Sequence, residues 1–127
     1  MLVLKPSILA SGVGVFTTAA IARGAHVRLW QNEDSRFVTD AEAEADPEIR
    51  EARDVHCVVV EGGYVCPLDF HRMSVGWYMN HSSRPNIASS DALGWEFYAT
   101  RDIAAGEELL CDYGGLSPLE TVPPDYK

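Results

Sequence analysis

Short apolar runs separated by glycine-rich or polar turns dominate the chain, a pattern typical of β-strands. The runs at 57–61 and 64–67 flank the pair Gly62-Gly63. This predicts a hairpin whose two turn residues are these glycines, because glycine supplies positive φ without a steric penalty. Alternation of apolar and polar residues after a turn-like segment predicts another strand at 95–98.

One helix is expected over 46–53, where Asp46 can cap the first turn and proline follows at the first helical position. A turn or more of helix is expected within 70–79, whereas 108–111 predicts a short buried strand. The tail at 117–127 is rich in proline, which predicts irregular structure. Together these patterns predict a small, mainly β domain with short strands and little helix.

Two segments of the chain, 16–27 and 98–109, repeat each other 82 residues apart. In each, an aromatic residue stands five positions before isoleucine, glycine three after it, and an aliphatic residue three after the glycine. This pattern predicts a strand that ends near the aromatic, a loop whose isoleucine packs in the core, and a glycine turn into the next strand. We therefore expect two similar β-corners in one domain, built around Phe16, Ile21, Gly24 and Val27 and around Tyr98, Ile103, Gly106 and Leu109.

The chain has 127 residues, 46% of them hydrophobic, and a formal net charge of −9, which fits one globular domain. No apolar run approaches the roughly 18 residues of a membrane span, and the N-terminal segment has the wrong order for a signal peptide, so no membrane association is expected. Three widely spaced cysteines fit a reducing cytoplasm better than a disulfide framework. The acidic balance predicts no direct binding to nucleic acid and favours a basic partner.

The acidic residues are concentrated at 33–54, which holds nine acids and three bases and accounts for −6 of the net charge. Two interpretations are open: a solvated helical face, or an acidic lip that attracts a basic peptide. Lysine is scarce, since only Lys5 and Lys127 occur, so lysine-directed chemistry would find its target in another protein.

Three segments carry the residue types of a ligand site. The Gly-Val-Gly at 12–14 lacks the third glycine of a dinucleotide-binding loop, but two glycines let the backbone approach a ligand closely; a plain turn is the alternative. The polar segment 80–86 contains Asn80 and His81, which could hold a polar ligand or belong to a hydrogen-bonded structural loop. Tyr113 follows a predicted strand, and its phenol either faces a site or covers the core.

Taken together, these segments resemble the SET domain of protein-lysine methyltransferases. The resemblance rests on Gly-x-Gly-x-Phe at 12–16, Ile-Ala-Arg-Gly at 21–24, Asn-His-Ser-x-x-Pro-Asn at 80–86, and Gly-Glu-Glu-Leu through Asp-Tyr-Gly at 106–114. The string at 80–86 with Asp-Tyr-Gly about thirty residues later is its most specific part. In size the chain is similar to the minimal, single-domain SET proteins of bacterial or viral type.

The resemblance implies a β-clip fold, in which short strands form several small sheets and the C-terminal segment passes beneath a loop as a pseudoknot, an exception to the usual unknotted topology. We accordingly expect a single SET domain at 1–127, with its core at about 5–115. An acidic insert is expected at 33–54 and a proline-rich C-terminal tail at 116–127. The segment 80–86 is then expected to meet Tyr113 at one site.

By the same resemblance the cofactor is S-adenosylmethionine and the reaction is methyl transfer to a lysine amine. Tyr113 resembles the family's catalytic tyrosine, whose oxygen orients the methyl group and the amine. Cys111 stands where the family usually has Phe or Tyr, so we expect it to line the lysine channel with Tyr113 and to permit di- or trimethylation. The residues that resemble the cofactor-binding positions are Gly12, Val13, Gly14, Tyr78, Asn80 and His81.

Two further expectations concern the surroundings of this site. No Cys-x-x-Cys occurs, so no metal site is expected. A lid over the cofactor and the lysine channel is expected from Leu116, Leu119 or Tyr126, or from a second copy of the chain in a homodimer.

The sequence therefore predicts S-adenosylmethionine-dependent methylation of a basic, lysine-rich protein, of the histone-like or ribosomal kind. The expected compartment is the cytoplasm, with the nucleus or a nucleoid as alternatives. Two other functions stay open: a catalytically weak SET-like module that binds cofactor or a basic peptide, and a β-clip protein that binds another small molecule.

Overall fold

The computed structural model describes residues 1–10, 12–30, 34–89 and 96–117. Short strands outnumber helices there, which confirms the mainly β fold class predicted from the sequence. The elements in chain order are β1 (Leu2–Pro6), β2 (Val13–Thr17), β3 (His26–Val27), β4 (Ser35–Thr39), α1 (Asp40–Ala45), α2 (Pro47–His56), β5 (Val58–Val60), β6 (Gly63–Pro67), the 3₁₀ helix η1 (Val75–Tyr78), β7 (Asn80–His81), β8 (Ile87–Ser89), β9 (Phe97–Ala99), β10 (Glu108–Cys111) and the 3₁₀ helix η2 (Tyr113–Gly115).

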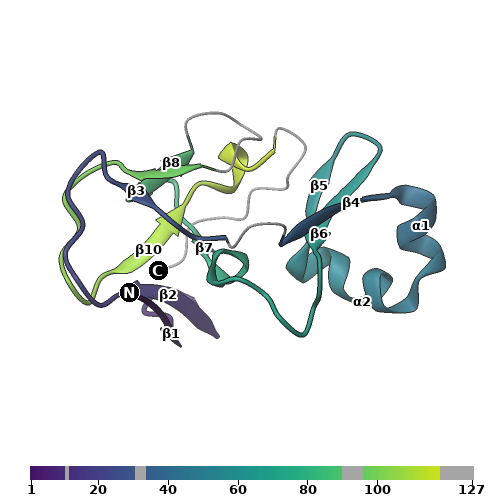
Figure 1. Cartoon of the computed structure of the whole chain (residues 1–127), viewed down its shortest axis with the longest axis horizontal. Coiled ribbons are helices and arrows are strands. Elements are labelled where there is room, and N and C mark those ends of the chain that lie inside the picture. Colours follow the sequence, from purple (N-terminus) through teal and green to yellow (C-terminus); the bar gives the residue numbers. More distant parts are fainter. Residues whose placement is uncertain (11, 31–33, 90–95, 118–127) are drawn as a thin grey trace.

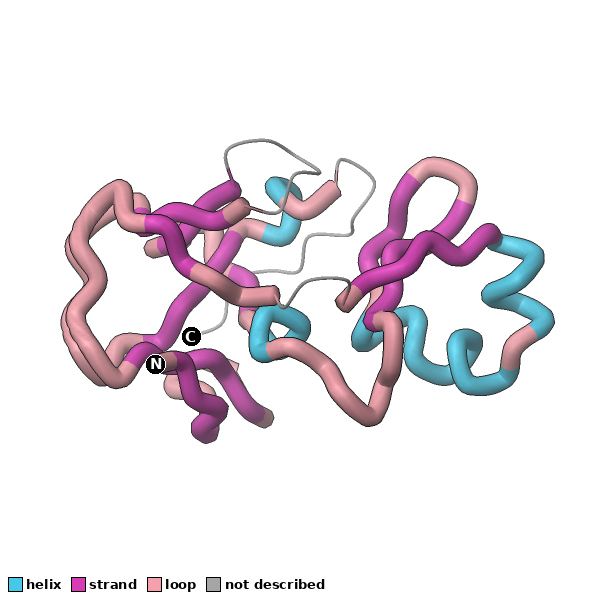
Figure 2. Tube along the Cα trace, in the orientation of Figure 1, coloured by secondary structure: helices cyan, strands magenta, loops and turns pink. Residues whose placement is uncertain are grey.

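The elements form an elongated molecule with two lobes (Figure 1 and Figure 2). The main lobe, described at residues 1–10, 12–30, 75–89 and 96–117, contains a sheet of order β1-β2-β10-β7 and a sheet of order β3-β9-β8. The insert lobe, residues 35–67, contains the sheet β4-β6-β5 together with α1 and α2. The acidic stretch at 33–54 thus covers the first part of the insert lobe, including α1 and most of α2.

Asp34 ties together the two chain segments that enter and leave the insert lobe. Its carbonyl accepts a hydrogen bond from the Leu68 amide at 3.0 Å. Its carboxylate accepts the Ser74 amide at 2.9 Å and the Trp77 indole N–H at 3.3 Å. One side chain therefore joins the base of the insert lobe to η1 of the main lobe.

The internal repeat folds into two β-corners that exchange strands with each other. The first strand of each repeat pairs with the second strand of the other, since β2 pairs with β10 and β9 pairs with β3. The repeat isoleucines lie at the centre of this exchange, where Ile21 and Ile103 each donate an amide hydrogen bond to the other's carbonyl at 2.8 Å. The two corners predicted from the repeat are thus one interlocked unit.

The two repeat glycines occupy equivalent places in this exchange. Gly24 has φ +83° and donates to the Ala99 carbonyl at 2.8 Å, while Gly106 has φ +89° and donates to the Thr17 carbonyl at 2.8 Å. Both acceptors directly follow the aromatic residue of the opposite repeat. Positive φ turns the chain into its second strand at both corners, which is why glycine stands at both positions.

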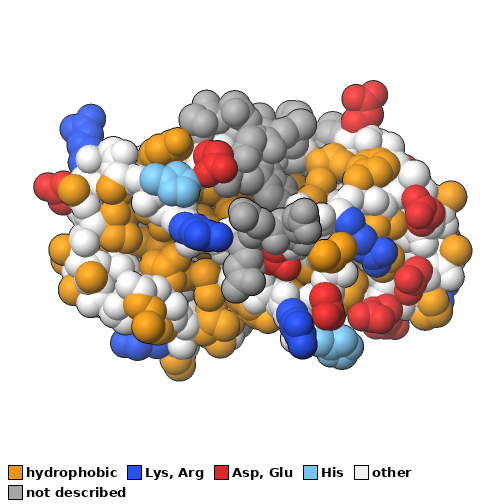
Figure 3. Space-filling view, in the orientation of Figure 1, with side chains coloured by type: hydrophobic (Ala, Val, Ile, Leu, Met, Phe, Trp, Pro, Cys, Tyr) orange, Lys and Arg blue, Asp and Glu red, His pale blue; other side chains and the backbone are white. Residues whose placement is uncertain are grey.

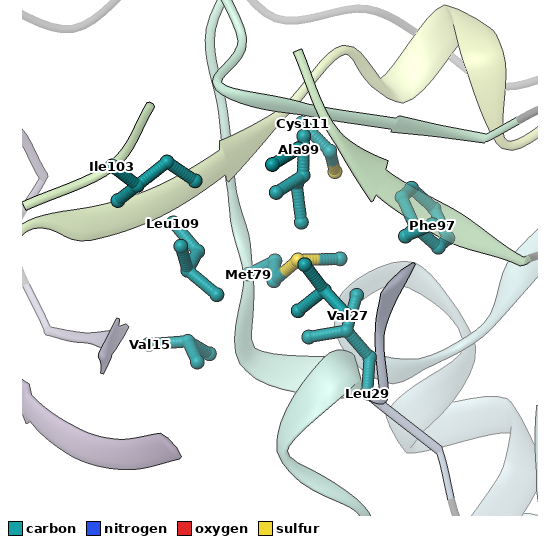
Figure 4. Packing of buried hydrophobic residues seen from close by; sticks show 10 residues of the cluster. Val15, Val27, Leu29, Met79, Phe97, Ala99, Ile103, Leu109 and Cys111 are labelled. Carbon is teal, nitrogen blue, oxygen red and sulfur yellow. The ribbon is translucent and has the colours of Figure 1, made fainter. Parts of the chain in front are cut away.

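The interlocked corners enclose the main hydrophobic core, which Figure 4 shows at close range. Burying one Leu, Ile or Phe side chain contributes about 1.5–3 kcal/mol, so this cluster is a principal source of stability. Its members come from β2, β3, β8, β9, β10 and the segments beside them: Val15, Val27, Leu29, Met79, Ile87, Phe97, Ala99, Ile103, Leu109 and Cys111.

The helix predicted at 46–53 is present as α2, and it extends to His56. Its cap is the predicted one, because the Asp46 carboxylate accepts the amide of Glu48 at 2.9 Å. The helix α1 was missed by the sequence analysis, although Thr39 and Glu42 form a capping box that marks its start. No helix in the described ranges is long and apolar enough to cross a membrane.

The predicted hairpin is present as β5 and β6, but its turn was placed one residue too late. Val60 pairs with Gly63, so the turn residues are Glu61 and Gly62, the latter with φ +79°. Gly63 instead lies within β6, where a Cβ would overlap the Val38 carbonyl of β4. The second glycine therefore permits a close strand contact instead of a turn.

Three other predictions need correction or lie outside the described residues. The strand predicted at 95–98 is β9 at Phe97–Ala99, and Trp95 lies outside the described ranges. Asn80 and His81 belong to the strand β7 rather than to a loop, since two residues suffice to pair with β10. Most of the proline-rich tail, 118–127, is not described.

Asn86 clamps the last strand against the loop that follows β7. Its side-chain Nδ2 donates to the Glu108 carbonyl and its Oδ1 accepts the Leu110 amide, both at 2.8 Å. Its backbone N–H donates to the Leu110 carbonyl, and the Ser82 amide donates to the Cys111 carbonyl. The side chain is 1% exposed, so water cannot replace these bonds.

We predict that Asn86→Asp lowers the free energy of unfolding by about 2–4 kcal/mol, because a carboxylate oxygen would face the Glu108 carbonyl and leave it unsatisfied. Urea denaturation followed by circular dichroism measures this loss. Glu51→Gln, an exposed change on α2, is the control and should stay within about 0.5 kcal/mol of the original protein. Equal urea midpoints for the two variants would contradict the clamp.

Candidate active site

The parallel pairing of β7 with β10 brings together segments that are about thirty residues apart in the sequence. Asn80 lies opposite Leu110 and His81 lies opposite Cys111. Because β10 also pairs with β2 on its other edge, the glycine segment 12–14 reaches the same place. The three segments that the sequence suggested for a ligand site, 12–14, 80–86 and the segment of Tyr113, therefore meet at one edge of the main lobe.

Tyr113 is held at both ends by its neighbours. Its backbone N–H donates to His81 Nδ1 at 3.1 Å, and its hydroxyl donates to the Met79 carbonyl at 2.7 Å. The rings of Tyr113 and His81 pack with centroids 5.2 Å apart. The phenol oxygen is therefore fixed in position beside the strand that carries Asn80.

His81 is a structural acceptor in this arrangement. The side chain is 2% exposed, and its Nδ1 accepts the Tyr113 amide, so the neutral ring carries its proton on Nε2. Asp112, half exposed, lies 3.8 Å from Nδ1. A ring with its lone pair already in use orients Tyr113 and is not available as a general base.

Asn80 joins the glycine segment to the strand β10. Its Nδ2 donates to the Val13 carbonyl at 3.0 Å and to a Glu108 carboxylate oxygen at 2.9 Å. Gly14 lies in β2 beside this contact, and a Cβ there would overlap the Glu108 carboxylate. Gly12 has φ +103°, which supports the turn into β2. Gly14 thus permits the close approach of β2, β7 and β10, whereas Gly12 serves the turn.

Glu108 is the site residue that the sequence analysis missed. It is 3% exposed, and its carboxylate accepts the Ile8 amide at 3.1 Å and the Asn80 side chain, with the Ser7 hydroxyl 2.9 Å away. The available signal was a charged residue at the start of a strand that is otherwise apolar. Such a residue is seldom buried unless it has a task or a set of partners.

Two further predicted site residues make packing contacts, and their roles at the site stay predictions. The Tyr78 side chain packs edge-on against His56 of α2, with its hydroxyl 3.9 Å from the Met73 sulfur. It therefore contacts the insert lobe. Cys111 lies in the main core and is 1% exposed (Figure 4). Its place in the lysine channel stays a prediction.

Of the predicted lid residues, Leu116 is half-buried against the main core. Leu119 and Tyr126 lie outside the described residues. Across the described ranges, no group of three or more His, Cys, Asp and Glu side chains is arranged to hold a metal ion.

Burial raises the pKa of the Cys111 thiol to about 12, and the nearby Asp112 carboxylate adds to this effect. We therefore predict that iodoacetamide at pH 8 leaves Cys111 unmodified in the folded protein, since a thiol with this pKa is only ~10⁻⁴ ionised there. Peptide mass mapping measures the modification, with the same reaction in urea as the control. Rapid alkylation of folded protein would contradict the assignment.

Comparisons with known proteins agree with this geometry. The sequence profile of the family described as SET domain matches residues 12–114. No curated protein matches the sequence significantly. A Plasmodium falciparum protein described as a candidate histone methyltransferase has a similar fold, with a TM-score of 0.58 and 22% identity, over 90% of this chain and 97% of that chain.

Two structures of Polycomb Repressive Complex 2 are also similar. A humanized mutant of the Chaetomium thermophilum complex, bound to an inhibitor, matches with a TM-score of 0.63 and 28% identity. An apo form of Polycomb Repressive Complex 2, designated ctPRC2 and carrying two substitutions in Ezh2, matches with a TM-score of 0.66 and 26% identity. Each match covers 90% of this chain but only 15% of the other. With the family match over residues 12–114 and the converging motifs, the chain belongs to the SET domain family of protein-lysine methyltransferases.

Proposed function

We propose that this chain transfers a methyl group from S-adenosylmethionine to a lysine of a basic, lysine-rich protein. The observation that carries the proposal is the fixed phenol of Tyr113, which is bonded at its hydroxyl to Met79 and at its backbone to His81. Beside it, Asn80 and the glycine segment form a polar edge. This combination of a fixed oxygen and an adjacent polar edge suits orientation of a methyl donor and an amine.

The residues present fit the proposed cofactor. S-adenosylmethionine carries two positive charges, on its sulfonium and its ammonium groups, and one carboxylate. The site offers a carboxylate, Glu108, that is 3% exposed and accepts hydrogen bonds without a Lys, Arg or His partner among the described residues. Gly14 leaves the strand edge beside it without a side chain. Gly12, Val13, Asn80 and His81 are the residues that we expect to hold the cofactor.

When bound, the cofactor would supply an electrophilic methyl group. The lysine must lose a proton before it attacks, because its pKa is about 10.4 in water. His81 cannot take that proton, since its Nδ1 is occupied and its Nε2 is protonated. We therefore expect the proton to leave through water, helped by a desolvated channel that disfavours the ammonium form. Tyr113 then contributes by orienting the reacting groups.

The charge of the insert lobe supports a basic substrate. Residues 35–67 hold eight acidic and three basic residues, a formal net charge of −5. Figure 3 shows acidic side chains distributed over this face of the lobe. Glu42 and Glu44 have local structural partners, because Glu42 closes the α1 capping box and Glu44 pairs with Arg53 at 3.1 Å. The remaining exposed acids are the better candidates for attracting a peptide.

Calorimetry with S-adenosylmethionine, followed by transfer of labelled methyl groups to histone, nucleoid and ribosomal proteins, tests the proposal. Binding and transfer together would support it, and mass spectrometry of the product would count the methyl groups added. Binding without transfer would favour a catalytically weak SET-like module. No binding would overturn the proposed function.

Tyr113→Phe should lower methyl transfer by about a hundredfold or more while cofactor affinity changes little, because only the orienting oxygen is lost. The rate of label transfer and the calorimetric dissociation constant measure the two effects. Tyr98→Phe, which removes the hydroxyl of a partly exposed tyrosine on β9, is the matched control. Normal transfer by the Tyr113 variant would refute the catalytic role.

Reversing two exposed acids of the insert lobe, Glu51→Lys with Glu61→Lys, should raise the Michaelis constant for a basic peptide roughly tenfold at low salt. Initial rates measured at low ionic strength and near 1 M salt separate electrostatic attraction from structural damage, because salt screens only the former. An unchanged Michaelis constant at low salt would mean that the acidic face serves solubility alone.

A further inference from the structure

We propose that Glu108 is a positioning residue that fixes the orientation of the Asn80 side chain, so that the Asn80 Oδ1 faces the ammonium group at the amino-acid end of the cofactor. This inference rests on the proposed function and goes beyond it. It assigns a task to a buried carboxylate that neither transfers a proton nor touches the methyl group.

The Glu108 carboxylate is a junction of three chain segments. Ser7 Oγ lies 2.9 Å from one of its oxygens and 3.0 Å from the other. The Ile8 amide donates to Oε1 at 3.1 Å, and Asn80 Nδ2 donates to Oε2 at 2.9 Å. The first two donors come from the turn between β1 and β2, and the third comes from β7. A single side chain thus sets the spacing of these segments.

The hydrogen bonds determine which way the Asn80 amide points. Both known partners of Nδ2, the Val13 carbonyl and the Glu108 carboxylate, are pure acceptors. A flipped amide would set its oxygen against both of them, at a distance where two acceptors repel. The nitrogen must therefore face Glu108, and Oδ1 points the other way as an acceptor. A cationic N–H donor is the best match for such an oxygen.

The turn that supplies two of the donors is itself organised by Ser7. Its hydroxyl oxygen accepts the amides of Leu9 and Ala10, each at 3.1 Å, and its own amide donates to the Gly12 carbonyl at 2.9 Å. Through Ser7, Glu108 is thus linked to the start of the glycine segment. The carboxylate sets the backbone of that segment and the Asn80 amide together.

The charge of Glu108 adds to this geometry. Among the described residues no Lys, Arg or His pairs with the carboxylate, so hydrogen bonds alone stabilise it. A buried anion without a cation is costly, and a cation bound nearby reduces that cost. The site is therefore suited to a ligand whose ammonium group lies beside Asn80.

Glu108→Gln tests the inference, with Glu107→Gln as the matched control. The control changes the neighbouring residue, whose carboxylate is turned toward Arg101 at 3.0 Å. Three probes are titrated by calorimetry or ligand-observed nuclear magnetic resonance: S-adenosylmethionine, S-adenosylhomocysteine, and 5′-methylthioadenosine, which lacks the amino-acid end. Asn80 and Ile8 amide resonances are recorded for each variant without ligand.

We expect Glu108→Gln to weaken both amino-acid-bearing probes by about tenfold or more, since a hydrogen bond to a charged group is lost, and to leave methylthioadenosine within about twofold. The Michaelis constant for S-adenosylmethionine should rise by the same factor, with that for the peptide unchanged. The Asn80 side-chain resonances should shift in this variant and not in the control. Equal weakening of all three probes would indicate a merely structural role and would overturn the inference.

The outcomes also separate this inference from the proposed function. If the unmodified protein binds S-adenosylmethionine and Glu108→Gln binds it equally well, the inference is wrong and the proposed function stands. If the unmodified protein binds none of the probes, the proposed function fails, and with it the assignment of a cofactor ammonium to Asn80. In that case unshifted Asn80 resonances would also overturn the positioning of its side chain.

Discussion

The parallel pairing of β7 with β10 is the contact on which the rest of the structure depends. It joins segments distant in sequence through only two residue pairs, too few to be stable alone. Asn86 stabilises this short pairing, because its side chain forms hydrogen bonds with two backbone groups of β10 and its own amide donates to a third. This clamp therefore supports the strand pair that brings His81 and Tyr113 together.

The interlocked repeat explains how β7, a strand of two residues, finds a firmly held partner in β10. Each β-corner contributes a strand to the other, so β10 pairs with β2 along one edge and with β7 along its other edge. The two isoleucines bond reciprocally at the crossing. Along β10, Leu109 and Cys111 face the core, while Glu108 lies on the other face and accepts hydrogen bonds from the β1–β2 turn and from Asn80. One strand thus separates the hydrophobic interior from the candidate site.

Local patterns in the sequence were sufficient for much of this structure. The cap at Asp46 and the strand β10 follow from residue types and spacing, whereas the convergence of segment 80–86 with Tyr113 was expected only from the resemblance to the SET domain. What could not be predicted depends on distant partners. The strand β7 exists because β10 lies beside it, and Glu108 is buried because donors from the β1–β2 turn meet it. Likewise, the contact of Tyr78 with His56 joins residues of different lobes.

Asp34 holds together the two ends of the insert lobe, and this affects how freely the length of the lobe can vary. Because the segments that enter and leave the lobe are already held together, added residues between them cost little conformational entropy, about 0.6 kcal/mol for each doubling of length. The lobe can therefore be enlarged or replaced while β2, β7 and β10 keep their places. The insert lobe and the strands that form the candidate site can therefore vary independently of each other.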